Sequence, residues 1–217
     1  MSRQIIVFVH GVWMPGSEML FLKQQLSWEH DYKGRLFSYP SVSGSLDDNA
    51  KKLADCIISQ GSDKVHIVAH SLGGVVALRM AATIADLPLV RIVCLGSPLR
   101  GSRAAEVLSE KIWGQNILGH SLSAGVVKEA VSGWAGNVTD HYDIGVIAGT
   151  RSIGLGKLFA SFDGENDGTV AVEETRLAGI KDHICLPISH SGLVLSKDVV
   201  MQTAAFLGCG EFLRDDS

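Results

Sequence analysis

Ser71, Asp167 and His190 are the residues whose types and order could carry out chemistry together. A serine hydroxyl is a weak nucleophile at neutral pH, so it needs a base within hydrogen-bond reach to take its proton. The base in turn needs an acid that orients it and stabilises its positive charge. A serine, an acid and a histidine therefore predict attack on a carbonyl carbon, if the fold brings the three side chains together.

Ser71 lies at the apex of a predicted strand–turn–helix unit. The apolar run 65–69 predicts a buried strand, and the small-residue pattern 73–85 predicts the helix that follows. A sharp turn of this kind exposes the hydroxyl and needs small residues two positions before and after it, here Ala69 and Gly73. The positive end of the helix would favour an oxyanion beside the serine. An ordinary Ser-Gly turn is the simpler alternative, and the partner residues favour the catalytic interpretation.

His190 is the best placed of the eight histidines to act as the base. It follows the last predicted strand, 183–188, and functional sites of parallel sheets lie beyond the carboxyl ends of the strands. His183 begins the same strand and is therefore at the wrong end. We expect the side chain of His70 to point away from the neighbouring serine. We expect His10 to hold its own loop by hydrogen bonding.

The acid is expected in the segment 163–167, between the last two predicted strands. Asp163, Glu165 and Asp167 all lie within reach of the same loop. Carboxylates this dense could also bind calcium, but their spacing does not match an EF-hand loop. We therefore expect no metal and no cofactor.

Strands and helices are predicted to alternate along the chain, which indicates an α/β fold: a mostly parallel sheet with helices on both faces. The predicted strands are 4–9, 35–39, 65–69, 90–96, 142–148 and 183–188. The predicted helices include 17–30, 46–60, 73–85 and 196–207. In such a sheet Ser71, the acidic segment and His190 fall at one edge, where the strands end.

The composition indicates a globular protein and excludes several other classes. The chain has 217 residues, 46% of them hydrophobic, which fits one globular domain over 1–217. The net charge of −4, with no basic cluster, makes nucleic acid an unexpected partner. No apolar run is long enough to span a membrane, and the run 5–9 is too short for a signal peptide. The sequence does not indicate an oligomeric state.

The four cysteines, Cys56, Cys94, Cys185 and Cys209, show no C-x-x-C spacing, and three lie in apolar contexts. We expect buried free thiols in a reducing compartment. Together with the missing targeting signals, this predicts a cytoplasmic location.

Four motifs resemble those of the α/β-hydrolase superfamily. They are His10-Gly11, the elbow Ala-His-Ser-Leu-Gly-Gly at 69–74, Asn-Asp-Gly-Thr-Val at 166–170 and Ser-His-Ser-Gly at 189–192. The chain is similar to small bacterial lipases and esterases, including the compact lipases and the GPI-inositol-deacylase-like branch. Ala69 departs from the glycine that usually occupies its position. The resemblance implies a compact α/β-hydrolase fold.

The resemblance also implies roles for individual residues. Ser71 would be the nucleophile and His190 the base. Asp167 opens a D-G-x-V pattern at which many family members carry the acid, which favours it over the alternative Asp163. The backbone N–H groups of Val12, after His-Gly, and of Leu72, after the serine, would form the oxyanion hole.

The activity implied is that of a serine esterase or lipase, which cleaves a small carboxylic ester with an apolar acyl part through an acyl-enzyme. A thioesterase or an acyltransferase with the same triad is one alternative. A non-catalytic binding module is another, although such relatives usually lose a triad residue. The fold hosts all of these, so the motifs do not specify the substrate.

The segment 101–137 falls where α/β-hydrolases insert a cap or lid. It contains helical patches at 104–113 and 122–131 and two tryptophans, Trp113 and Trp134. A short lid over an apolar substrate and a packing helix with loops are both consistent with this pattern.

Overall fold

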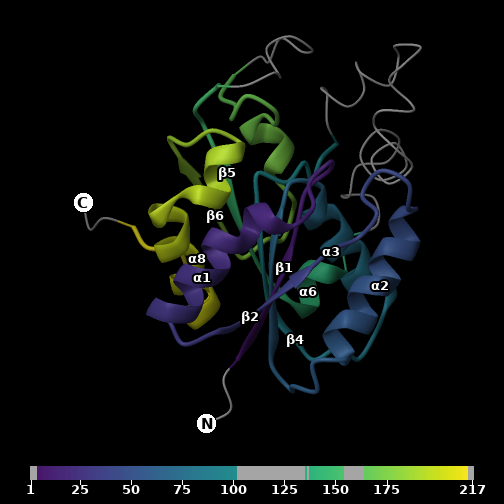
Figure 1. Cartoon of the computed structure of the whole chain (residues 1–217). Coiled ribbons are helices and arrows are strands. Elements are labelled where there is room, and N and C mark those ends of the chain that lie inside the picture. Colours follow the sequence, from purple (N-terminus) through teal and green to yellow (C-terminus); the bar gives the residue numbers. More distant parts are fainter. Residues whose placement is uncertain (1–3, 102–134, 136, 154–163, 215–217) are drawn as a thin grey trace.

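The structure is a computed structural model that describes residues 4–101, 135, 137–153 and 164–214 (Figure 1). The segment 101–137, in which a lid or cap is expected, lies almost entirely outside the described residues. The alternative acid Asp163 also lies outside them, as do Trp113 and Trp134.

A parallel sheet forms the centre of the molecule, as the alternation of elements predicts. Its six strands within the described residues are β1 Ile5–Val9, β2 Lys33–Phe37, β3 Val65–His70, β4 Leu89–Leu95, β5 Asp143–Gly149 and β6 Asp182–Leu186. They lie in the order β2-β1-β3-β4-β5-β6. β3, which ends just before Ser71, is therefore an interior strand, while β6 lies at one edge.

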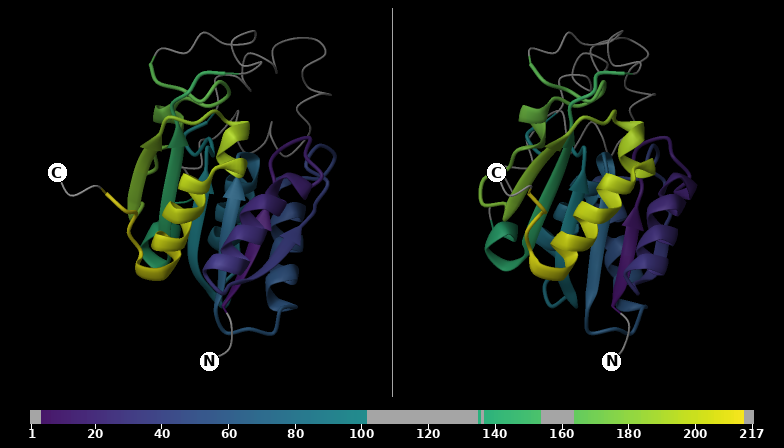
Figure 2. Two further views of the ribbon diagram at one scale, coloured as in Figure 1. Left: turned by 60° about the vertical axis from the view of Figure 1, so that its left-hand side comes forward. Right: turned by 90° about the vertical axis from the view of Figure 1, so that its left-hand side faces the viewer.

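Helices cover both faces of the sheet (Figure 2). One face carries α1 Leu20–Glu29 and α8 Lys197–Cys209, and the other carries α2 Leu46–Ile58, α3 Leu72–Thr83 and the short α6 Val138–His141. In β1, Ile6 and Phe8 pack with the first group, whereas Val7 and Val9 pack with the second. Successive strand residues face opposite sides, so a strand covered on both faces must be apolar throughout.

Element boundaries differ from the predicted ones by a few residues. The helix predicted over 17–30 opens as the 3₁₀ turn η1 Ser17–Met19 before α1. β6 ends at Leu186 rather than at residue 188 because Pro187 has no N–H to donate. β2 begins at Lys33, where it pairs with Ile5 of β1.

Three segments that leave the carboxyl ends of strands carry the candidate residues. Ser71 follows β3 directly. Asp167 lies between β5 and the 3₁₀ turn η4 Val172–Thr175, and His190 lies between β6 and the 3₁₀ turn η5 Ser191–Leu195. The sheet therefore brings all three segments to one end of the molecule.

The prediction of buried cysteines is wrong for two of the four. All four thiols are free, but only Cys94 is fully buried, while Cys185 and Cys209 are exposed. Cys185 belongs to the edge strand β6, which is less covered than the interior strands. Among the described helices, none combines the length and apolar character that crossing a bilayer requires.

Candidate active site

Ser71 occupies a strained turn between β3 and α3. Its backbone has φ 54° and ψ −123°, a conformation that residues other than glycine rarely adopt. The N–H of Ser71 donates to the carbonyl of Leu95 at the end of β4, at 2.9 Å. A Cβ at Gly73 would lie 2.6 Å from the carbonyl oxygen of Val9, so only glycine fits there. The small residue demanded by the motif thus lets α3 start against the end of β1.

Asp167 and His190 are joined by a short hydrogen bond. Oδ2 of Asp167 lies 2.7 Å from Nδ1 of His190, and the two side chains are 1% and 12% exposed. The other carboxylate oxygen, Oδ1, accepts from the N–H groups of Thr169 at 2.9 Å and Val170 at 2.7 Å. With both oxygens bonded, the carboxylate is held in one orientation against the imidazole.

This contact determines which nitrogen of the neutral His190 ring carries the hydrogen. A carboxylate only accepts hydrogen bonds, so Nδ1 carries the hydrogen of the neutral ring. Nε2 is then the acceptor nitrogen. The backbone N–H of His190 also donates to the carbonyl of Asp167, at 2.9 Å, which locks the two loops together.

His10 organises the loop that follows β1. It is fully buried, and its Nε2 accepts from the N–H of Tyr39 at 3.2 Å, so its Nδ1 donates to the carbonyl of Gly11 at 2.7 Å. The ring of Tyr39 stacks on the imidazole, and its hydroxyl donates to the carbonyl of His10 at 2.8 Å. Burial raises the pKa of Tyr39 above its ordinary value, which keeps this hydroxyl a donor.

The two proposed oxyanion donors come from segments that meet at Ser71. Leu72 is the first residue of α3, so its N–H has no carbonyl four residues back within the helix. Val12 follows Gly11, where an added Cβ would lie 3.1 Å from Cβ of Ser71. The loop after β1 therefore passes directly beside the serine.

The described residues contain no hydrogen bond between Ser71 and His190. The segments nevertheless touch, because Nε2 of His70, the residue before the serine, lies 3.1 Å from the carbonyl oxygen of His190. A serine and a base often tighten into hydrogen-bond distance only when a substrate is bound. The structure thus joins Asp167 to His190 and brings the strand that precedes Ser71 against His190.

The other acidic and histidine residues lie away from this contact. His183, at the start of β6 as expected, shares a 2.9 Å hydrogen bond with the hydroxyl of Thr175. Glu165 is exposed, and its backbone carbonyl accepts from Val172. Neither residue has a hydrogen bond to His190 in the described part of the chain.

Sequence reasoning missed three residues of the site. Tyr39 braces His10, and His70 contacts His190 although it was assigned no role. Gly96, with φ 53°, lies so close that an added Cβ would be 3.0 Å from Oδ2 of Asp167 and 3.2 Å from Nδ1 of His190. Only Gly96 had a signal, as a glycine that ends the apolar run of β4.

Comparison with solved structures shows the fold. The mature form of the lipase BlEst2 from Bacillus licheniformis is 20% identical and covers 96% of this chain and 92% of its own, with a TM-score of 0.73. An esterase from Exiguobacterium antarcticum is 13% identical over 95% of this chain and 92% of its own, with a TM-score of 0.65. The carboxylesterase CesB from Bacillus subtilis is 13% identical over 96% and 85%, with a TM-score of 0.59.

Comparison with curated proteins gave no significant match. A model of the alpha/beta hydrolase family matches residues 6–142, which include β1 from its second residue, the loop after β1, the turn at Ser71 and strands β2 to β4. This match spans more than half of the chain, and the protein therefore belongs to the alpha/beta hydrolase family.

Proposed function

We propose that the protein is a serine hydrolase that cleaves carboxylic esters, with Ser71 as nucleophile, His190 as base and Asp167 as the acid that orients it. One observation carries the proposal: the 2.7 Å contact between the buried carboxylate of Asp167 and Nδ1 of His190, in the loops that leave the sheet beside the serine turn. A buried carboxylate on Nδ1 selects the tautomer whose Nε2 can accept a proton and stabilises the imidazolium that forms.

The reaction proceeds in two halves. Oγ of Ser71 bonds to the ester carbonyl carbon while its proton passes to Nε2 of His190, and the carbonyl electron pair moves to oxygen. The N–H groups of Val12 and Leu72 hold that oxyanion. The tetrahedral intermediate collapses, the alcohol leaves with the proton from His190, and an acyl-enzyme remains. Water then attacks the acyl-enzyme, His190 takes its proton, and Ser71 regains it as the acid departs.

The names of the structural neighbours support an ester as the substrate. They include a lipase, an esterase and a carboxylesterase, at identities of 13–20% to this chain. We propose a small ester with an apolar acyl part. The cytoplasmic location and a lid within 101–137 stay predictions.

Labelling with a fluorophosphonate probe tests the proposal directly. Intact-mass analysis should show one adduct on the wild type and none on the Ser71→Ala variant, because only an activated serine is phosphonylated at an appreciable rate. Ser71→Ala should also lower ester hydrolysis by about 10⁴-fold or more. A folded wild type that takes up no probe would contradict the proposal and favour a binding module.

Substrate class follows from a second measurement. The wild type should hydrolyse 4-nitrophenyl esters in preference to acyl-CoA thioesters, and water should compete with added alcohols as the acceptor. A preference for acyl-CoA, or for an alcohol over water, would turn the assignment to a thioesterase or an acyltransferase with the same three residues.

A further inference from the structure

His70 occupies a position between the parts of the candidate site. It is the last residue of β3, precedes Ser71 in the chain and is only 3% exposed. Its Nε2 lies 3.1 Å from the carbonyl oxygen of His190, a residue 120 positions further along the chain. The rings of His70 and His190 have their centroids 4.7 Å apart. The imidazole therefore lies directly against the proposed base.

The partner of Nε2 determines the form of the His70 ring. A carbonyl oxygen only accepts, so Nε2 carries hydrogen and donates to His190. Burial, with a smaller contribution from the neighbouring His190, lowers the pKa of His70 to about 3. The ring thus remains neutral above that pH and places no positive charge beside an imidazole that must itself become protonated during turnover.

The opposite nitrogen of His70 faces the loop that follows β1. Nδ1 is buried and has no hydrogen-bond partner among the described residues. An added Cβ at Gly11 would lie 3.3 Å from this nitrogen and 3.1 Å from Cβ of Ser71. One flat side chain therefore lies between Gly11, in the loop that follows β1, and His190.

Three hydrogen bonds hold His190 against other segments of the described part of the chain. Asp167 accepts from its backbone N–H and from its Nδ1, and His70 donates to its backbone carbonyl. The first two bonds fix His190 relative to Asp167, whereas the third fixes it relative to the strand that ends at the serine. Removing the third bond would leave the acid–base pair intact but free to shift against Ser71.

From these contacts we infer that His70 is a positioning residue, whose Nε2–H bond to the His190 carbonyl sets the place of the base relative to the nucleophile. The inference deepens the function proposed above and rests on it. Misplacing a catalytic group by about 1 Å can cost roughly a hundredfold in rate. His70 touches no reacting atom, so its effect is exerted through His190.

Two amide variants separate the hydrogen bond from the bulk of the ring. In His70→Gln, the side-chain nitrogen is as many bonds from Cα as Nε2 of histidine, so a donor is kept toward His190. In His70→Asn, the nitrogen matches the position of Nδ1 instead, and the donor to His190 is lost. Both variants bury a neutral amide in place of a neutral imidazole, so the loss of the ring and the burial of an amide are common to both.

His66 provides the control for general damage to a buried histidine on the same strand. It is 1% exposed, lies on the same face of β3 because it is four residues earlier, and its Nε2 is 2.7 Å from Oε1 of Gln4. Burial, with smaller contributions from Arg91 and Lys64, also lowers its pKa, to about 4. It stands at the opposite end of the strand, so His66→Asn loses a comparable bond far from the base.

The experiment measures fluorophosphonate labelling rate, kcat and KM for 4-nitrophenyl butyrate, and melting temperature for the wild type and the three variants. His70→Asn should lower the labelling rate and kcat between about tenfold and a hundredfold, with KM changed less than about threefold. His70→Gln should recover most of that loss. His66→Asn should lower the melting temperature without lowering kcat.

A second readout needs no turnover. The Nδ1–H proton of His190 is hydrogen-bonded to a carboxylate and should therefore give a far-downfield signal in proton NMR. The signal should shift or broaden in His70→Asn and persist in His70→Gln and His66→Asn. It therefore reports the placement of His190 whether or not the protein proves to be a hydrolase.

The outcomes are distinguishable. Equal losses of kcat in His70→Gln and His70→Asn, or an unchanged His190 signal in His70→Asn, would overturn the inference. A wild type that takes up no fluorophosphonate would instead overturn the proposed function. In that case the NMR signal of the His190 Nδ1–H proton decides. A signal that changes in His70→Asn but persists in His70→Gln supports positioning by His70, and a signal that is the same in both variants refutes it.

Discussion

Both ends of the sheet carry buried histidine and aspartate side chains, but these side chains have different partners at the two ends. β3 carries the buried His66 at its beginning and the buried His70 at its end. Asp182 begins β6, whereas Asp167 lies beyond the carboxyl ends of the strands. The side chains of Asp182 and Asp167 are 8% and 1% exposed, so burial alone does not distinguish them.

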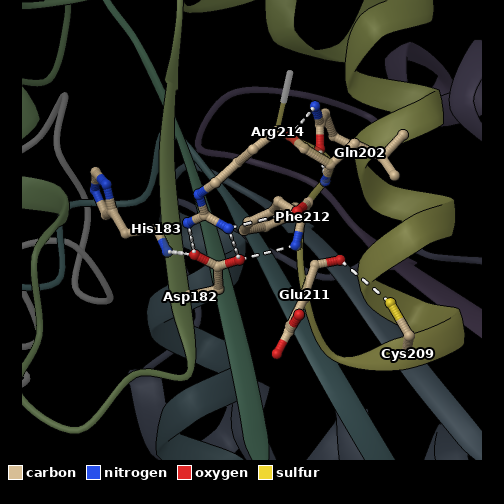
Figure 3. A network of polar contacts seen from close by, with 8 residues as sticks. Asp182, His183, Gln202, Cys209, Glu211, Phe212 and Arg214 are labelled. Carbon is tan, nitrogen blue, oxygen red and sulfur yellow. Dashed lines mark hydrogen bonds and ion pairs between the residues drawn. The ribbon is translucent and has the colours of Figure 1, made fainter. Parts of the chain in front are cut away.

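At the amino end, Asp182 fastens the C-terminal segment to the sheet (Figure 3). Its carboxylate accepts from the N–H groups of Phe212 at 2.8 Å and His183 at 2.7 Å, and it forms an ion pair with Arg214. Beside it, Gln202 exchanges two hydrogen bonds with the backbone of Leu213, at 2.8 and 3.0 Å. A guanidinium keeps its proton at any ordinary pH, so the ion pair of Arg214 with Asp182 takes no part in proton transfer.

At the carboxyl end, the partner of the carboxylate is an imidazole. The contact of the His190 imidazole with Asp167 leaves Nε2 as the acceptor nitrogen. The two carboxylates therefore differ in their partner and in the end of the sheet at which they lie. Asp182 pairs with a guanidinium and holds the C-terminal segment, whereas Asp167 pairs with an imidazole and could assist proton transfer.

The largest expected difference between the two carboxylates is in activity. Asp167→Asn keeps the shape of the side chain but removes the charge. Its amide oxygen can take the N–H groups of Thr169 and Val170, which turns the NH2 group toward Nδ1 of His190 and selects the wrong tautomer, so kcat should fall by about 10³–10⁴-fold. Asp182→Asn should leave kcat within about threefold of the wild type, because its contacts are static ones at the far end of the sheet. The kcat of both variants is measured by steady-state hydrolysis of 4-nitrophenyl butyrate. Similar losses of kcat in both variants would contradict the different roles of the two carboxylates.

Two left-handed glycines sharpen the comparison. Gly96, with φ 53°, has Asp167 and His190 within 3.2 Å of an added Cβ, whereas Gly61, with φ 59°, has no atom of the described residues within 4 Å. Both alanine variants should lose about 1–2 kcal/mol of unfolding free energy from backbone strain. Only Gly96→Ala should also lose activity, by about a hundredfold, because the methyl group displaces Asp167 or His190. Denaturant unfolding and ester hydrolysis are measured on both variants. An equal loss of activity in Gly61→Ala and Gly96→Ala would show that the loss comes from lower stability and not from displacement of Asp167 or His190.

The buried histidine at the amino end predicts an acid-dependent loss of stability. The pKa of His66 is about 4 in the folded protein, lowered from 6.5 by burial first and then by Arg91 and Lys64. Between these values the unfolded chain binds a proton that the folded chain does not, so the unfolding free energy falls as the pH drops from about 6.5 to about 4. His66→Gln should make this fall shallower, by up to about 1.4 kcal/mol per pH unit. Urea unfolding across this range measures the slope, and an unchanged slope would contradict the assignment.

The smallest expected effect concerns the ion pair at the amino end. Partial burial alone would raise the pKa of Asp182, but hydrogen bonds from Arg214 and from the N–H groups of Phe212 and His183 hold this pKa below its ordinary value. The stabilisation is therefore complete above the pKa of an unfolded aspartate, about 4, and is lost as the pH falls further.

Melting temperatures of the wild type and Asp182→Asn should accordingly differ by roughly 2–4 °C at pH 7 and converge toward pH 3. A difference that persists at pH 3 would show that packing, rather than charge, fastens the C-terminal segment.

The sequence by itself determined the class of fold and the ends of the strands at which the candidate residues lie. Strands buried on both faces appear as uninterrupted apolar runs, as in β1 and β3, and these local signals do not depend on the partner strand. The turn at Ser71 was equally readable, because its small neighbours are needed by nearby backbone. The exposure of Cys185 was not, because the edge position of β6 is a property of the strand order.

Only the tertiary structure decided which residues support the candidate site. Tyr39 meets His10 because β2 lies beside β1, and His70 meets His190 across 120 positions because the loop after β6 reaches the carboxyl end of β3. Gly96 is confined by Asp167 and His190 in the same way. Periodicity reports how deeply a residue is buried, but the identity of its neighbour depends on strand order and loop path, which no local pattern encodes.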